Sequence, residues 1–374
     1  LLAAAWTLAI SERHEEAQRL VTRILAQPQV DDGLRCECAL ILGGAAVFAD
    51  LPDRFVELHA PWTDYPLNDP MLLQVQANRT AYRALLEGEP ALARLRQQQA
   101  PRGEFGRGLG FVGRWGELII GLSYLWEGQA LLADQLLRPA LASAEADLGR
   151  RNRLGCMLAA LLASAAWEGD RPADAAALLA DRLDVLERGG LPECLLLAYR
   201  TLARLALSEG AEHRALELLG ALEAAGAART LPRLGIVSLA EQVFLHARRY
   251  RGQTCRELCS QIQARLQDPA LPAGPLWRHR VELLHEQAQA YAAIAAKDWR
   301  GALAPLARAD ELALQIKQGR LHIELLGMRA FALDRCGEDA RALLREATDL
   351  AQAHGLRCVF MDGHPPPGAG GARA

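Results

Sequence analysis

The stretch Glu209–Leu219, which reads EGAEHRALELL, decides the fold because its pattern returns along the chain. The same order of a turn glycine, an alanine and a leucine pair occurs at 127–137, EGQALLADQLL, and at 336–344, CGEDARALL. Looser copies centre on Ala17, Ala93, Ala175, Cys255 and Ala302. Between these centres five steps are 40 to 42 residues, one is 47, and the first, 76, is long enough to hold a degenerate extra unit. A fixed period of this size is typical of stacked repeats.

Composition and apolar spacing indicate that each repeat is a pair of helices. Hydrophobic residues make up 51% of the 374 residues, mostly Ala and Leu, and aromatics only 5%, which suits helices and disfavours a sheet. In the unit around the quoted stretch, Leu195, Ala198, Leu202 and Leu205 recur at helical spacing before Gly210 ends the helix. A single pair cannot cover its apolar face, so it must stack on its neighbours.

The sequence therefore predicts an all-α, right-handed superhelical solenoid of about nine antiparallel pairs, similar to tetratricopeptide (TPR) arrays, over residues 1–362. The expected pairs are 1–11 with 14–27, 33–49 with 51–59, 70–87 with 90–100, 109–126 with 129–148, 152–168 with 172–188, 191–208 with 212–225, 232–248 with 252–267, 276–296 with 299–317, and 320–335 with 338–354. Residues 60–70 are expected to be a packed connector. The Pro- and Gly-rich end, 363–374, is expected to be a flexible tail or linker.

Charge and cysteine usage exclude several classes of protein. A net charge of −3 and a pI near 6.4 argue against a broad phosphate-binding surface. The longest uncharged stretch, 154–167, has 14 residues and is too short to cross a bilayer. The eight cysteines are scattered through apolar segments, which favours a reducing cytoplasm. Because the chain begins without Met, we expect it to be a fragment of something longer.

Motifs that carry chemistry are weak or absent. The segment 108–113, GLGFVG, fits a dinucleotide-loop pattern, but no strand precedes it, so a loop and helix start is the better interpretation. Neither Lys follows a P-loop pattern. Cys255 and Cys259 lie four apart without a second ligand pair, so buried apolar thiols are expected rather than zinc ligands. We predict no catalytic residue, no metal and no cofactor in this chain, and hence a protein that is not an enzyme.

The surface that remains is the concave side of the array, which the first helix of each pair commonly lines. Polar and aromatic residues on these helices are the best candidates for binding an anionic or sugar-like effector, or a peptide segment. These candidates are Arg79, Tyr82, Arg114, Trp115, Glu117, Tyr199, Arg200, Gln242, His246, His279 and His285.

The forty-residue period, the phrase at 118–137 and the closing run 347–362 resemble the repeat region of large ATP-dependent LuxR-type (MalT-like) transcriptional activators. In that family a stretch similar to Gly-Leu-x-Arg-x-Phe-x-Asp closes the helical array. The residues that match it here are Gly355, Leu356, Arg357, Phe360 and Asp362, whereas His364 and three prolines replace the usual continuation.

This resemblance implies a cytoplasmic sensor and oligomerisation region that binds a small-molecule inducer or a regulatory protein. ATP would bind, and DNA would be contacted, only through modules outside this chain. The alternative is a stand-alone TPR-like scaffold for protein–protein interaction, and an all-helical enzyme is a third hypothesis. As an isolated fragment the chain is expected to be a monomer or a weak dimer, because an array cut at both ends exposes apolar terminal faces.

Overall fold

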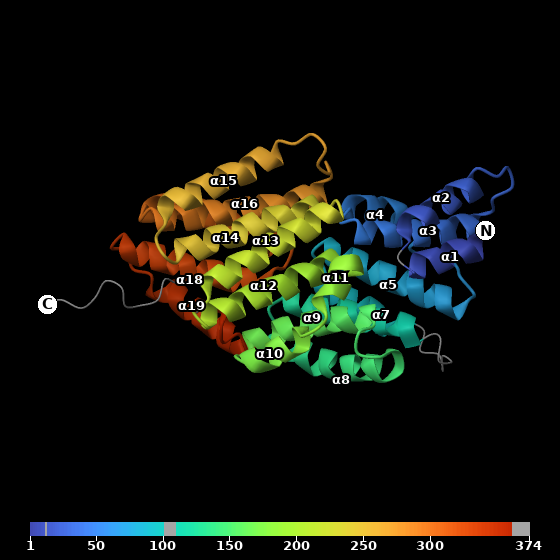
Figure 1. Cartoon of the computed structure of the whole chain (residues 1–374), viewed down its shortest axis with the longest axis horizontal. Helices are drawn as coiled ribbons and strands as arrows, with labels where there is room; N and C mark the ends of the chain where they lie inside the picture. The colour runs from blue at the N-terminus through green and yellow to red at the C-terminus, as the bar shows by residue number, and fades with distance from the viewer. Residues whose placement is uncertain (12, 101–109, 361–374) are drawn as a thin grey trace.

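The computed structural model describes residues 1–11, 13–100 and 110–360, which form helices and no strand (Figure 1). The helices are α1 (Leu2–Ile10), α2 (His14–Leu25), α3 (Asp32–Phe48), α4 (Pro52–His59), the short 3-10 helix η1 (Ala60–Trp62), α5 (Pro70–Leu86), α6 (Pro90–Gln98), α7 (Gly110–Trp126), α8 (Ala130–Leu148), α9 (Arg153–Glu168), α10 (Pro172–Leu179), α11 (Leu183–Gly189), α12 (Pro192–Ser208), α13 (Glu212–Ala228), α14 (Pro232–Ala247), α15 (Gly252–Leu266), α16 (Pro275–Ala295), α17 (Trp299–Gln315), α18 (Gly319–Arg335) and α19 (Arg341–His354). They make nine antiparallel pairs in the described ranges, and the prediction of an all-α helical solenoid is confirmed.

The turn inside a pair explains the repeated glycine. The chain reverses there through a residue with positive φ, which glycine adopts without strain. Gly88, Gly128, Gly210 and Gly337 fill this position with φ between 78° and 82°. In other pairs the same left-handed position is taken by Asp50, Asp170, Tyr250 and Lys297. The forty-residue period is therefore the spacing of these turns.

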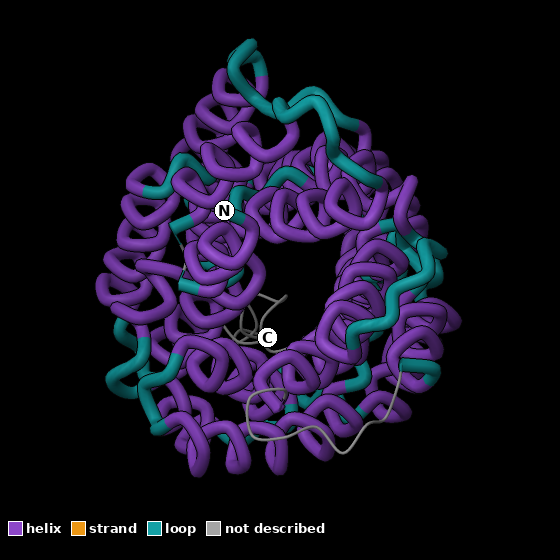
Figure 2. The backbone as a smooth tube through the Cα atoms, turned by 90° about the vertical axis from the view of Figure 1, so that its right-hand side faces the viewer, coloured by secondary structure: helices purple, strands orange, loops and turns teal. Residues whose placement is uncertain are grey.

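The pairs are arranged in two layers around a common axis (Figure 2). The first helices from α1 to α16 contact one another in succession along the inside of the superhelix, and the second helices cover them outside. An inner helix such as α9 is buried on nearly all sides, from Leu154 to Ala163 without a break. The outer α13 buries only one stripe, which begins with Ala215 and Leu218. This difference matches the apolar runs of the first helices and the amphipathic pattern of the second.

The superhelix turns tightly enough for its two halves to touch. Helix α4 contacts α16, and α7 contacts α18. The carboxylate of Asp53 accepts hydrogen bonds from the backbone amides of Leu276 (2.9 Å) and Trp277 (3.1 Å), and so caps the start of α16 from the other side of the ring. A Cβ on Gly128 would lie 2.9 Å from the backbone nitrogen of Arg320, which shows how closely the opposing turns approach.

Ion pairs one period apart connect successive repeats. Arg171 binds Asp134, 37 residues earlier, at 2.5 Å. Arg200 binds Glu241 at 2.6 Å, and Arg251 reaches Glu212 in the same way. These pairs hold neighbouring repeats in register.

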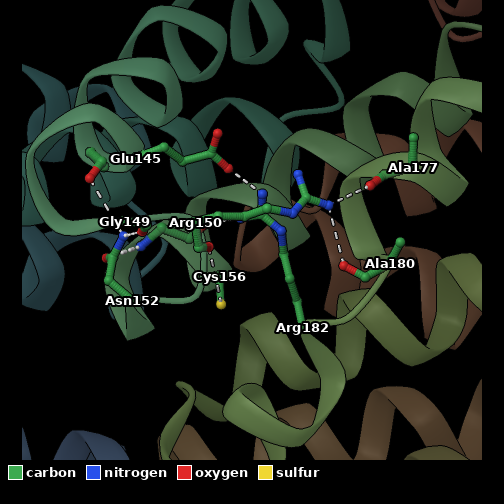
Figure 3. A network of polar contacts seen from close by, with 10 residues as sticks. Glu145, Gly149, Arg150, Asn152, Cys156, Ala177, Ala180 and Arg182 are labelled. Atoms are coloured by element: carbon green, nitrogen blue, oxygen red, sulfur yellow. Dashed lines mark hydrogen bonds and ion pairs between the residues drawn. The ribbon is translucent and has the colours of Figure 1, made fainter.

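The expected single helix over 172–188 is wrong, because the chain breaks between α10 and α11. Asp181 adopts φ 59°, which ends α10 early. Arg150 donates to the freed carbonyls of Ala177 (3.2 Å) and Ala180 (3.3 Å), as Figure 3 shows. The break turns the buried Arg182 back toward Glu145 and the carbonyl of Gly155. At the break, hydrogen bonds from Arg150 and Arg182 thus take the place of hydrogen bonds within one continuous helix.

Two further expectations concern loops and termini. The connector 60–70 is packed, since the amide of Gln76 donates to the carbonyls of Trp62 (2.8 Å) and Tyr65 (2.9 Å). The glycine-rich segment enters helix α7 at Gly110, while residues 108 and 109 lie outside the described residues. The expected tail, 363–374, and Asp362 lie outside them too. Within the described ranges, no helix is both long enough and apolar enough to span a membrane.

Candidate functional site

Among the described residues, first helices line two chambers on the inside of the superhelix. The first, called here the ionic chamber, has a volume of about 140 Å³ and lies among α9, α12, α14, α16 and α18. Leucines such as Leu196 and Leu284 also line it. The charged lining residues are Glu168, Glu193, Arg200, Arg204, Arg233, Glu241, Arg280, Arg320 and Glu324.

One group of charges in the ionic chamber centres on Glu193, near the start of α12. Its carboxylate binds Arg233 of α14 at 2.9 Å and Arg280 of α16 at 2.8 Å. Arg233 also forms a bidentate pair with Asp50, both contacts measuring 2.8 Å. Burial would raise the pKa of Glu193, but the two guanidinium groups hold the pKa below its usual range. The indole of Trp126 lies under Arg280, 4.9 Å from its central carbon.

A second group of charges centres on the buried Glu324 of α18. It accepts hydrogen bonds from Tyr291 and Gln287 of α16, and Arg320 pairs with it one helical turn earlier. Arg320 also reaches Glu168 of α9 at 2.5 Å, which ties α18 to the opposite side of the ring. Opposing charges from five helices, α9, α12, α14, α16 and α18, therefore line the chamber.

The second chamber, called here the apolar chamber, lies in the N-terminal half and has a volume of about 130 Å³. Its wall comes from α1, α3, α5 and α7, with Arg153 of α9 and Leu191 at one side. The apolar part of the wall includes Trp6, Phe48, Met71, Val75, Trp115 and Ile119. The ring of Phe48 meets Trp115 edge-on at 5.9 Å and stacks on His14 at 4.9 Å.

Arg79 supplies a cation to this apolar wall. Gly44 of α3 makes room for it, because a Cβ at that position would lie 2.5 Å from Nη2 of Arg79. Nε of Arg79 and both ring nitrogens of His14 are inaccessible to solvent and have no hydrogen-bond partner among the described residues. Burial, with the charges of Arg79 and Arg229, lowers the pKa of His14 to about 4, so the imidazole is neutral at pH 7.

Tyr82 belongs to the partition between the chambers. It lines the apolar chamber and is buried, and its ring meets that of Phe55 edge-on at 5.7 Å. Burial raises the pKa of its hydroxyl, and so does the nearby Glu193 of the ionic chamber. The two chambers are thus adjacent but chemically distinct.

The structure brings four of the predicted binding residues to the chambers. Arg79, Tyr82 and Trp115 line the apolar chamber together, and Arg200 lines the ionic chamber. Their role in binding stays a prediction.

The other seven predicted residues lie outside both chamber walls. Arg114 pairs with Asp147 of α8, Tyr199 donates to Glu187, Gln242 donates to Ser238 at 3.1 Å, and His279 contacts the carbonyl of Leu312 at 2.8 Å. Glu117 is half-buried beside Arg114, His246 lies 3.2 Å from Arg251, and His285 lies 3.1 Å from Gln289.

Sequence reasoning missed most of the charged lining of the ionic chamber. One signal was present: Glu193 and Arg233 each follow a helix-starting proline, and they are one period apart. Equivalent positions in neighbouring repeats lie side by side, so a Glu and an Arg there predict an ion pair. No comparable signal marks Arg320 or Glu168, whose meeting depends on the curvature of the whole array.

The candidate site contains no group of side chains arranged to bind a metal ion, within the part of the chain that the structure describes. Among the described residues, no cluster of three or more His, Cys, Asp or Glu side chains could hold a metal ion. The prediction that the chain uses no cofactor stays a prediction.

No protein-family model matches the sequence, and no curated protein is similar to it. In three dimensions the chain is similar to a Rap protein that was solved in complex with Competence and Sporulation Factor, with a TM-score of 0.72 and 12% sequence identity. The similarity covers 94% of this chain and 97% of that chain. At this identity the likeness concerns the fold, and it supports a TPR-like helical repeat over nearly the whole length.

Proposed function

We propose that this chain is the effector-receiving region of a regulatory protein and that a peptide segment of the effector inserts one end into the ionic chamber, whose volume of about 140 Å³ admits no more than one or two of its residues. One observation carries the proposal: paired arginines and glutamates from successive first helices line one interior space, and leucines line the same space. A peptide has backbone donors and acceptors, charged ends and apolar side chains, and such a mixed wall can satisfy all three. The structurally similar Rap protein was solved with a bound factor, which is consistent with an interaction role for this fold.

The finer proposal is that the parent protein is a LuxR-type transcriptional regulator and that binding is passed to ATPase and DNA-binding modules. It depends on the sequence resemblance. The DNA sequence on either side of the coding segment tests it, since a P-loop module upstream and a helix-turn-helix module downstream are expected. A gene with neither would favour the alternative of a stand-alone interaction scaffold.

Peptide binding can be tested with a library of random pentapeptides screened by thermal shift, followed by calorimetric titration of the peptides that stabilise the protein. Arg200 is suitable for substitution because it lines the chamber and is partly exposed. We expect Arg200→Gln to weaken binding at least tenfold. Arg214, whose exposed pair with Glu217 lies on the outer helix α13, gives the matched control Arg214→Gln. Equal loss in both variants, or no stabilising peptide at all, would contradict the proposal.

Regulation also requires that the bound and free forms differ in free energy and in shape. We expect a bound peptide to replace part of the ion pairing across the ring and to change the pitch of the superhelix. Small-angle scattering with and without the peptide measures this directly. An unchanged scattering profile for a saturated complex would contradict the proposed signalling role but not the proposed peptide binding.

A further inference from the structure

The apolar chamber is a second interior space whose chemistry differs from that of the ionic chamber. None of the described residues that line it is acidic, whereas three basic residues, Arg79, Arg153 and His14, line it. The rest of its wall is aromatic or aliphatic. A buried guanidinium normally faces a carboxylate, since an uncompensated buried charge is costly. Among the described residues, no carboxylate pairs with Arg79.

The residues around Arg79 hold its guanidinium in a defined position. Gly44 leaves the space that the guanidinium occupies, and any larger residue would displace Nη2. Tyr82, one turn later on α5, lies on the same chamber wall. Buried polar atoms without partners are rare in folded proteins, and Nε of Arg79 and the nitrogens of His14 are such atoms on one wall. The Arg79 guanidinium has no hydrogen bond or ion pair among the described residues, so a ligand that brings an acceptor into this chamber would supply one, and would also satisfy the N–H of His14 but not its acceptor nitrogen.

The size of the chamber limits the ligand. Its volume of about 130 Å³ is close to that of an engineered apolar cavity of about 150 Å³ that binds benzene. The aromatic edges of Phe48 and Trp115 offer favourable contacts for a ring or a short branched chain. The ligand must also carry one anionic group, which the guanidinium of Arg79 can bind through two parallel hydrogen bonds.

We propose that the apolar chamber binds a small monocarboxylate that carries a ring or a short branched chain, with its carboxylate on Arg79. The apolar part lies between Phe48, Trp115 and Ile119. The neutral imidazole of His14 has a donor and an acceptor nitrogen at the same wall, and its donor contributes a hydrogen bond to the carboxylate beside the two from Arg79. This site is separate from the peptide site of the proposed function, and Tyr82 belongs to the partition between them.

Benzoate is the probe that fits these limits, and calorimetric titration of the wild-type chain is the test. Benzamide has the same ring without the charge, and acetate has the charge without the ring. We expect benzoate to bind at least tenfold more tightly than either. This comparison needs no variant. Equal binding of benzoate and benzamide, or no binding of benzoate, would overturn the proposal.

The position of the carboxylate is tested with Arg79→Met, which keeps the apolar stem and removes the charge. We expect benzoate to bind at least tenfold more weakly, while benzamide changes by less than threefold. The matched control is Arg83→Met on the same helix, because Arg83 pairs with Glu87 and lies outside the chamber wall. Loss of benzoate binding in both variants, or in neither, would contradict the assignment.

Two further arms separate this site from alternatives. N-acetylphenylalanine carries the same groups in the form of a peptide end, and its binding tenfold more tightly than benzoate would assign a peptide terminus instead. Arg200→Gln, which alters only the ionic chamber, should leave benzoate binding unchanged. Failure of the peptide screen with benzoate binding intact would remove the proposed function and keep the carboxylate site.

Discussion

Asp50 and Arg233 form a buried bidentate ion pair between residues 183 positions apart in the sequence, with both contacts at 2.8 Å. Asp50 belongs to the turn between α3 and α4, and Arg233 to the first turn of α14. Both side chains are at least nine-tenths buried. The pair therefore joins the N-terminal half of the superhelix to the C-terminal half at a place from which solvent is excluded.

Removing one charge from this pair should destabilise the fold strongly. Asp50→Asn keeps the side-chain shape and the left-handed backbone, which Asn adopts readily, but leaves Arg233 with one carboxylate fewer. We expect a loss of about 3 kcal/mol in the free energy of unfolding, measured by urea denaturation. Asp170→Asn is the matched control, since Asp170 has φ 59° in the equivalent turn and is exposed. Equal effects of the two substitutions would show that the pair contributes nothing.

The closure of the ring should be measurable through its glycines. Gly128 and Gly210 have nearly the same backbone, φ 79° and 78°, but only Gly128 faces another turn closely. Gly210→Ala introduces left-handed strain alone, about 1 kcal/mol. Gly128→Ala adds a clash with the backbone of Arg320, so we expect about 2–4 kcal/mol in total. Urea denaturation of both variants measures the two losses in unfolding free energy. Similar losses would mean that the turn at Gly128 does not pack against the turn at Arg320.

The sequence was sufficient to predict the repeats because each one is local. Helix spacing, turn glycines such as Gly210 and the prolines at helix starts lie within one period, and the structure confirms the pairs they predicted, apart from the break in the expected helix 172–188. The closure of the ring could not be predicted from the sequence, because the contacts of Asp53 with α16 depend on the curvature that many repeats build up together. For a related reason, only some of the predicted binding residues line a chamber. Being on a first helix places Arg79 in a chamber, but the same rule places Arg114 against α8.

Cysteine reactivity should follow burial. Burial raises the pKa of Cys255 to about 11 and, together with the neighbouring Cys255, raises that of Cys259 to about 12, so few thiolates form at pH 8. Cys336 is the only cysteine of the eight that is not buried. We expect iodoacetamide to alkylate Cys336 at least tenfold faster than any other cysteine in the native chain, as measured by peptide mass spectrometry. In Cys336→Ser the fast phase should disappear, and a persistent fast phase would locate the reactive thiol elsewhere.

The buried His59 and the half-buried His14 should make the fold sensitive to mild acid. Burial, with nearby arginines, lowers the pKa of both His14 and His59 from 6.5 to about 4. The folded state therefore binds fewer protons than the unfolded state between pH 6.5 and 4, and stability falls as the pH falls through this window. Each histidine should cost about 2 kcal/mol between pH 7.5 and pH 5.

The measurement is the difference in unfolding free energy between pH 7.5 and pH 5.0, taken within each variant so that other effects of the substitution cancel. We expect about 4 kcal/mol of loss in the wild type and about 2 kcal/mol in His59→Gln. His59 contacts Thr80 at 3.1 Å and stacks on Phe55, so its surroundings are closed to water. The exposed His213 provides the control, because His213→Gln should keep the full wild-type loss. A His59→Gln variant as acid-sensitive as the wild type would show that the protonation of His59 does not limit the fold.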